Sequence, residues 1–272
     1  MPGQASAGLD RSRLQLVFSD EFDGAQLDRG RWIGHYLPQW TTPERSAARY
    51  DFDEQGLQLR IDADQPAWRP EDGEFRVSNI QTGAFAGPNG STVGTHRHVP
   101  DLRVRTALPT QRLWTPSSGL VEATLRASPD ATCMLAIWLV GFEEHSPDDS
   151  GEICIAELFG NAISPEQSQV RLGIKAHHDP RLTTDMVDLL LPIDARVEHT
   201  YGAEWDAARV RFYIDDRLVR TVEQGFGYPL QVMVDLFEFP PEGERDASRY
   251  PKSAHVRAVR GYQNRWAPGS AV

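Results

Sequence analysis

Short apolar runs bounded by turn residues recur along the whole chain, and this pattern restricts its fold more than any other feature. The runs occupy residues 14–18, 48–52, 57–62, 77–85, 119–127, 133–140, 170–176, 199–205, 209–214, 217–222 and 231–239. Helical periodicity is nearly absent, so the pattern predicts an all-β protein with antiparallel connections. The clearest hairpin spans residues 209–222, with Asp215 and Asp216 at its tip.

The chain of 272 residues is long enough for one large β-sandwich, and no flexible linker divides it. We predict a single domain over residues 14–264, an N-terminal tail over 1–13 and a C-terminal tail over 265–272. Membrane-spanning apolar runs are absent, and the formal charge of −11 disfavours nucleic acid and anionic lipid as partners. Residues 1–13 lack the apolar core of a signal peptide. The expected compartment is therefore the cytoplasm, or the extracellular space if a leader has been trimmed.

Two glutamates interrupt one apolar run, at residues 151–157 (GEICIAE). In a regular strand Glu152 and Glu157 point to opposite faces, whereas a β-bulge returns Glu157 to the face of Glu152 and Cys154. Two carboxyl groups about 5–5.5 Å apart on one rigid sheet have the geometry of a retaining glycosidase. The alternative is an edge strand whose glutamates face water.

The neighbouring sequence bears on this choice. A second strand-like run, residues 133–140, precedes the motif, and the turn residues 148–151 separate the two. The motif therefore lies on the second arm of a hairpin. Because this arm is apolar on both faces apart from its glutamates, we expect it to be a central strand of a stacked sheet.

The cysteines and histidines show no metal-ligand spacing. Cys133 and Cys154 both lie in strand-like runs, so we expect two buried, reduced thiols. The tightest histidine pair, His177 and His178, points to opposite faces if it is extended. We expect no cofactor and no zinc.

The order of the motifs resembles glycoside hydrolase family 16, the retaining endoglycanases built on a concanavalin A-like jelly roll. The resemblance covers most of the chain and rests on four segments besides the motif: residues 16–32, 119–127, 136–139 and 199–219. Residues 152–157 resemble the bulged form of the family's Glu-x-Asp-x-x-Glu signature. This implies a β-sandwich with a concave substrate groove, Glu152 as nucleophile and Glu157 as general acid/base.

Three positions depart from the family's pattern. Cys154 stands where the family has an aspartate bonded to the nucleophile, and a thiol is a weaker donor with a higher pKa. The Cys154 thiol could still form a weak hydrogen bond to Glu152. Ser150 stands where relatives often carry a tryptophan that packs under a sugar. Arg257 stands where many members place a calcium-binding aspartate, so we predict no structural metal.

Five further residues are candidates for contact with a sugar. Trp138 is expected on the concave face as a stacking platform, with a core position as the alternative. Trp40 lies in a polar, loop-like stretch that favours exposure as a second platform. His177 follows a strand whose counterpart in the family often carries a histidine near the cleaved bond, and a surface position is its alternative. Asn79 and Gln81 share one face of a predicted cleft strand, with solvent exposure as the alternative.

These observations predict a retaining endo-hydrolase of a β-linked polysaccharide, with a β-1,3- or mixed-linkage glucan as the family's commonest substrate. The groove is expected to be open across the concave sheet. Residues 87–109 form a long polar stretch that predicts either a loop over this groove or a surface insertion. Two rival functions use the same fold: a glycan-binding protein that has lost catalysis, and a transglycosylase.

Overall fold

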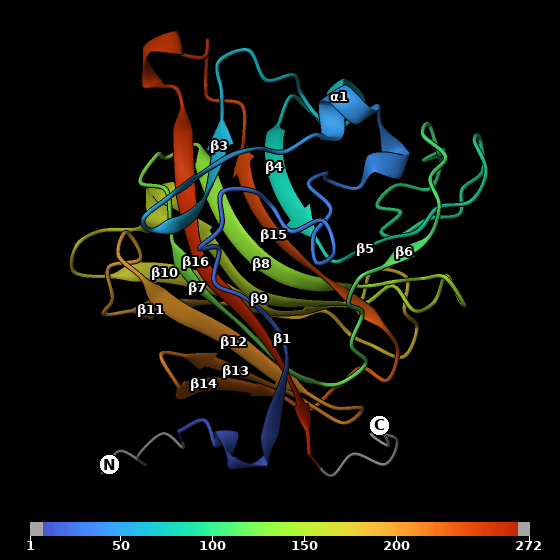
Figure 1. Ribbon diagram of the computed structural model, residues 1–272, viewed down its shortest axis with the longest axis vertical. Coiled ribbons are helices and arrows are strands. Elements are labelled where there is room, and N and C mark those ends of the chain that lie inside the picture. Colours follow the sequence, from blue (N-terminus) through green and yellow to red (C-terminus); the bar gives the residue numbers. More distant parts are fainter. Residues whose placement is uncertain (1–7, 266–272) are drawn as a thin grey trace.

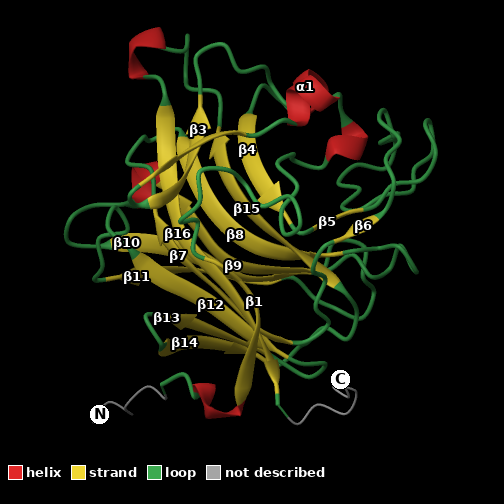
Figure 2. Cartoon of the chain, viewed as in Figure 1, coloured by secondary structure: helices red, strands yellow, loops and turns green. Residues whose placement is uncertain are grey.

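The computed structural model describes residues 8–265 and consists almost entirely of antiparallel strands in two packed sheets (Figures 1 and 2). The larger sheet has the order β14-β13-β12-β7-β16-β3-β2, and β1 also pairs with β16. Its strands are β1 (Leu14–Asp20), β2 (Arg49–Asp53), β3 (Gly56–Ile61), β7 (Gly119–Arg126), β12 (His199–Trp205), β13 (Val210–Ile214), β14 (Arg217–Val222) and β16 (Lys252–Asn264). The predicted antiparallel β-sandwich is confirmed.

The second sheet has six strands in the order β11-β10-β9-β8-β15-β4. They are β4 (Arg76–Gln81), β8 (Cys133–Gly141), β9 (Glu152–Phe159), β10 (Ser168–Lys175), β11 (Asp185–Leu191) and β15 (Leu230–Glu238). Strands β5 (Gly83–Ala84) and β6 (Gln111–Arg112) form a separate two-stranded sheet. This sheet and the four-residue helix α1 (Pro43–Ser46) lie on the β4 side of the six-stranded sheet (Figure 1). Among the described residues, no helix has the length and apolarity to cross a membrane.

Most predicted strands are present within one or two residues of their expected ends. The hairpin β13–β14 turns at Asp215 and Asp216, whose φ angles of 48° and 64° are those of a two-residue turn that matches the strand twist. Strand β11 was not predicted, because its sequence DMVDLLL does not alternate cleanly between polar and apolar residues. Residues 8–13 of the predicted N-terminal tail contact the large sheet: Gly8 bridges to Arg217, and Arg11 pairs with Glu122. Residues 1–7 and 266–272 lie outside the described part of the chain.

The main core fills the space between the two sheets. Alternate residues of β8 and β9, such as Ile137, Leu139 and Ile153, point inward and are fully buried. Their neighbours Ala136 and Trp138 point to the outer face of the six-stranded sheet. There they join a second apolar cluster with residues of the connecting loops. The outer face of this sheet is therefore only partly open to a ligand.

Candidate active site

The predicted β-bulge is present in β9. Ala156 pairs with Ile137 and Cys154 pairs with Trp138, so Ile155 is the extra residue. The bulge brings Glu152, Cys154 and Glu157 to one face, where one donor atom of each lies within 4.8 Å of the others. All three side chains are buried, and β9 is an interior strand, so the alternative of water-facing glutamates on an edge strand is wrong.

A lysine bridges the two glutamates. Lys175, the last residue of β10, lies opposite Glu152 in the β-ladder, and its Nζ lies 2.9 Å from Oε1 of Glu152 and 2.9 Å from Oε1 of Glu157. The two carboxylates raise the pKa of Lys175 although burial opposes this, so the side chain is an ammonium ion. Sequence reasoning missed Lys175. The signal was a lone lysine at the end of an apolar strand.

His177 donates a hydrogen bond from Nε2 to Oε2 of Glu152 at 2.7 Å, so the structure places it beside the motif strand. Burial by itself would raise the pKa of Glu152. The hydrogen bond from His177 and the positive charge of Lys175 outweigh it and lower this pKa to about 2. Glu152 is therefore a carboxylate anion across the whole physiological pH range.

Cys154 is fully buried between the glutamates. Burial raises the pKa of the thiol well above its usual value, and the neighbouring charges of Glu157 and Glu152 act in the same direction. The neutral thiol donates to the carbonyl oxygen of Arg171 at 3.8 Å rather than to Glu152. The suggested weak bond from Cys154 to Glu152 is therefore wrong, and His177 and Lys175 are the partners of that carboxylate. Both cysteines are free and buried, as predicted.

Trp138 faces the site from β8, and its indole Nε1 donates to the carboxyl group of Asp235 on β15. Burial raises the pKa of Asp235 well above its usual range. His96, from the loop over residues 87–109, packs its ring 5.3 Å from that of Trp138 and 4.8 Å from that of His177. Burial lowers the pKa of His96 well below its usual value, so its imidazole is neutral.

A cavity of about 240 Å³ opens directly above these groups. It is lined by Tyr36, His96, Met134, Ala136, Trp138, Glu152, Glu157, Lys175, His177, Phe237 and Phe239. A groove of about 520 Å³ continues from it and is lined by Met134, Glu157, Phe159, Arg171, Lys175, Met186, Val187, Asp188 and Phe239. The loop over residues 87–109 reaches the cavity through His96, so of its two interpretations the loop over the site agrees with the structure.

Three predicted sugar contacts are wrong in this structure. Trp40 is fully buried, and its Nε1 donates to the carbonyl oxygen of Thr95, so its ring offers no face to a sugar. Asn79 and Gln81 do lie on one face of β4, but both are fully buried. These side chains are buried because loops that are distant in sequence cover this end of the sheet. The backbone of His35, for example, accepts a hydrogen bond from Asn79.

Two donor sets at the site have the residue types of a metal centre. One is His96, Glu152 and His177, and the other is Glu152, Cys154 and Glu157. The ammonium group of Lys175 already contacts both glutamates, and its charge would repel a divalent cation at either position. The donor sets fit an ion-pair network better than a metal.

At the third departure from the family pattern, Arg257 donates to the carbonyl oxygen of Glu21.

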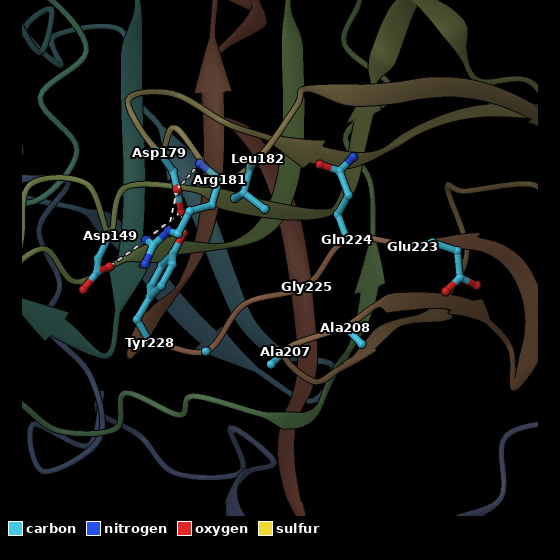
Figure 3. Close-up of a pocket in the computed structure, with 11 residues that line it drawn as sticks. Asp149, Asp179, Arg181, Leu182, Ala207, Ala208, Glu223, Gln224, Gly225 and Tyr228 are labelled. Carbon is cyan, nitrogen blue, oxygen red and sulfur yellow. Dashed lines mark hydrogen bonds and ion pairs between the residues drawn. The ribbon is translucent and has the colours of Figure 1, made fainter.

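A separate cavity of about 510 Å³ lies next to the start of β9 and contains none of the groups described above (Figure 3). Its charged side chains pair with one another: Arg181 contacts both Asp149 and Asp179. Tyr228 donates to Asp179 and accepts a hydrogen bond from the backbone N–H of Gly151. This network therefore holds the residue that precedes Glu152.

The sequence matches known proteins over most of its length. Residues 110–237 match the model of the Glycosyl hydrolases family 16. The endo-1,3-1,4-beta-glycanase ExsH of Rhizobium meliloti (strain 1021) is 23% identical over 240 residues, which are 86% of this chain and 48% of that protein. The chain thus spans about half the length of this curated relative.

Solved structures share the fold. A GlcNAcα1-4Gal-releasing endo-β-galactosidase from Clostridium perfringens superposes with a TM-score of 0.78 at 24% identity, over 95% of this chain and 64% of the other. The laminarinase from Rhodothermus marinus superposes with a TM-score of 0.63 at 20% identity, over 92% of this chain and 97% of the other. The predicted jelly roll is confirmed. Residues 110–237, which include the bulged motif strand, are thus similar to glycoside hydrolase family 16, and the whole chain shares the fold of these solved structures.

Proposed function

We propose that this protein is a retaining β-glycosidase that cleaves an internal linkage of a β-linked glycan. The observation that carries the proposal is the arrangement of Glu152 and Glu157, which have carboxylate oxygens within 4.8 Å of each other on one rigid strand. Retaining enzymes hold their two carboxyl groups about 5–5.5 Å apart, whereas inverting enzymes separate them by about 6.5–9.5 Å to admit a water molecule. The short separation supports retention.

In the first step, the Glu152 carboxylate attacks the anomeric carbon of the sugar while the bond to the leaving oxygen breaks. His177 and Lys175 keep Glu152 ionised for this attack. Glu157 transfers its proton to the leaving oxygen. The products of this step are a glycosyl ester on Glu152 and a free leaving group.

In the second step, a water molecule attacks the anomeric carbon and gives its proton to the Glu157 carboxylate. The ester bond breaks and Glu152 returns to its anionic form. If a sugar hydroxyl replaces the water, the same two glutamates perform transglycosylation. The neutral Cys154 contributes no charge to either step, because burial holds its thiol protonated.

The substrate class follows from the lining of the site and from the relatives. Apolar and aromatic side chains such as Trp138, Phe237 and Phe239 suit the flat apolar faces of pyranose rings. A β-1,3- or mixed-linkage glucan is the first candidate, in line with the named activity of the ExsH relative. A β-galactoside is the second candidate, because the endo-β-galactosidase superposes with the higher TM-score, 0.78 against 0.63 for the laminarinase.

The test is to incubate the protein with β-glucans, β-galactans and xylans and to measure new reducing ends. Glu152→Gln should lower turnover by at least roughly 10³-fold, because it removes the nucleophile with almost no change in shape. Glu166→Gln, at an exposed position, is the matched control and should keep full activity. Activity retained in Glu152→Gln would remove Glu152 as nucleophile.

The same incubations separate the rival functions. Binding of an oligosaccharide without any new reducing end over long incubation would identify a glycan-binding protein. Products longer than the substrate would identify a transglycosylase. The stereochemistry is read by proton NMR of the first-formed product, and an inverted anomeric centre would overturn the retaining mechanism.

A further inference from the structure

One half of the outer face of the six-stranded sheet is closed, although a groove across the whole sheet was expected. Outward-pointing side chains of β4 and β15 are almost entirely buried: Val77, Asn79, Gln81, Met233 and Asp235 are each at most 1% exposed. These two strands are neighbours at the β4 edge of the sheet. A glycan therefore cannot cross β4, and β15 contributes only Phe237 to the lining of the cavity above Glu152.

The segments that cover this half come from three parts of the chain, and we call them the cover: residues 36–40, Trp68 and residues 95–104. Their apolar side chains form one cluster with the outer face of the sheet. Hydrogen bonds join the parts of the cover. The indole of Trp68 donates to the carbonyl oxygen of Tyr36, and the indole of Trp40 donates to that of Thr95. A cover that is buried and cross-linked in this way is a fixed wall rather than a mobile loop.

The cover ends at the cavity above Glu152. Tyr36 and His96 belong to the cover and line the cavity, and Trp138 and His177 stand beside them. The cavity volume of about 240 Å³ is below the range of roughly 300–1,000 Å³ that is typical of ligand pockets. It therefore has room for a short saccharide only.

The opposite side of the site is open. The groove of about 520 Å³ shares Met134, Glu157, Lys175 and Phe239 with the cavity and runs out over β10 and β11. Glu157 borders both spaces, whereas Glu152 borders only the closed cavity. The proposed nucleophile and the proposed proton donor thus face two spaces of different depth.

This asymmetry gives the bound glycan a direction, and the inference rests on the proposed function. The sugar whose anomeric carbon is attacked must lie over Glu152, and the leaving group must reach Glu157. We propose that the closed cavity holds the non-reducing end of the glycan, two sugar residues long, and that the open groove holds the remainder of the chain. The enzyme would then cleave the internal linkage that follows the second sugar and release a disaccharide from the non-reducing end.

The test uses β-glucan and β-galactan oligosaccharides of four to eight sugars that carry a fluorophore at the reducing end. At low conversion, the first labelled product of the wild-type protein should be shorter than its substrate by two sugars at every length. A spread of first labelled products from a long oligosaccharide at low conversion, or a labelled product of constant size, would overturn the proposal.

A bulky ketal on the non-reducing terminal sugar supplies the matched control. The cap should lower kcat/KM by at least roughly 100-fold, because it clashes with the wall, whereas the equally bulky fluorophore at the reducing end should be tolerated. Equal cleavage of capped and uncapped octasaccharides would show that the groove is open at both ends.

Failure of the proposed function has a different signature, namely no Glu152-dependent product from any oligosaccharide. The direction of binding is then read by titration of the Glu152→Gln protein with the same oligosaccharides, with tryptophan fluorescence as the signal. Loss of binding on capping the non-reducing end would support the closed cavity even without catalysis. Binding that is indifferent to the cap would overturn it.

Substitution of His96, which is part of the wall, tests the length of the cavity. His96→Ala should lengthen the cavity, because the ring that packs against Trp138 and His177 is removed. Labelled products shorter than the substrate by three sugars should then appear. An unchanged product pattern would remove His96 from the wall.

Discussion

The ammonium nitrogen of Lys175 lies 2.9 Å from Oε1 of Glu157. The same nitrogen lies 2.9 Å from Oε1 of Glu152, so a single cation joins the proposed nucleophile to the proposed proton donor. In glycoside hydrolase family 16, which this chain resembles, an aspartate stands between the two glutamates. This chain has the neutral Cys154 at that position. The charge that organises the pair therefore comes from the adjacent strand β10.

Replacing Lys175 tests this arrangement. Lys175→Met should lower kcat by roughly 10²–10³-fold, because it removes a fixed charge from the reacting groups. It should also destabilise the fold by about 1–3 kcal/mol, since two close carboxylates lose their common partner. Lys252→Met is the control: this buried lysine pairs with Glu238 outside the cavity, so stability should fall without a comparable loss of kcat. Equal loss of kcat in both variants would contradict a specific role of Lys175.

Removing His177 should change the pH dependence of activity. The pKa of Glu152 is about 2 because the hydrogen bond from His177 and the charge of Lys175 outweigh burial. In His177→Ala the hydrogen bond that lowers the pKa of Glu152 is lost, so the effect of burial raises this pKa. The acidic limb of the kcat/KM profile should therefore move to higher pH by roughly one unit. His178→Ala is the control, because the side chain of His178 contacts the backbone of Arg97 instead. An unmoved acidic limb would mean that His177 does not set the ionisation of Glu152.

Cys154→Asp should shift the pH optimum. The new carboxyl group would lie where the thiol is now, within 4.8 Å of donor oxygens of both glutamates, and would bind a proton or compete for Lys175. Cys154→Ser is the control, since the hydroxyl has similar size and no charge, and its profile should match the wild type. A profile of Cys154→Asp that coincides with the wild type would place this position outside the reacting groups.

Glu143 should make the stability of the protein fall with rising pH. It accepts a hydrogen bond from the backbone N–H of His96 and so anchors the cover, and burial raises its pKa to about 8. In the unfolded chain Glu143 has its ordinary pKa of 4.5, so the folded state holds the proton more tightly. The free energy of folding gained in this way is fully present below pH 4.5, and it is lost as the pH rises through the folded-state pKa of about 8.

Glu143→Gln should remove this pH dependence, because glutamine accepts the same hydrogen bond without ionising. The measurement is the free energy of unfolding in urea at pH 5 and at pH 8.5. The wild type should lose stability between the two, by up to about 1.4 kcal/mol for each unit of pKa shift, and the variant should lose less. Glu166→Gln, at an exposed position, should behave as the wild type.

Local sequence patterns were sufficient for the sheets and for the motif strand. Alternation of apolar residues located most strands, because each strand must bury one face in the core. The two glutamates in an apolar run predicted a bulge between them, since only an extra residue brings side chains five positions apart to one face. The structure places the extra residue at Ile155. The hairpin at Asp215 and Asp216 followed from turn chemistry, which depends on neighbouring residues alone.

Other features depended on residues that are distant in sequence. Trp40 has a polar, loop-like neighbourhood, yet it is buried because Thr95 and Arg69 pack around it. Lys175 became part of the site only because β10 pairs with β9 and places it opposite Glu152.

The sequence by itself thus determined the class of fold, the strand that carries the two carboxyl groups and their common face, because these depend on periodicity and on near neighbours. Only the tertiary structure decided which charges surround the carboxyl groups and which half of the sheet stays open. The reason is that ion pairs and buried cover segments join positions far apart in the chain, and their pairing is set by packing that no local pattern encodes.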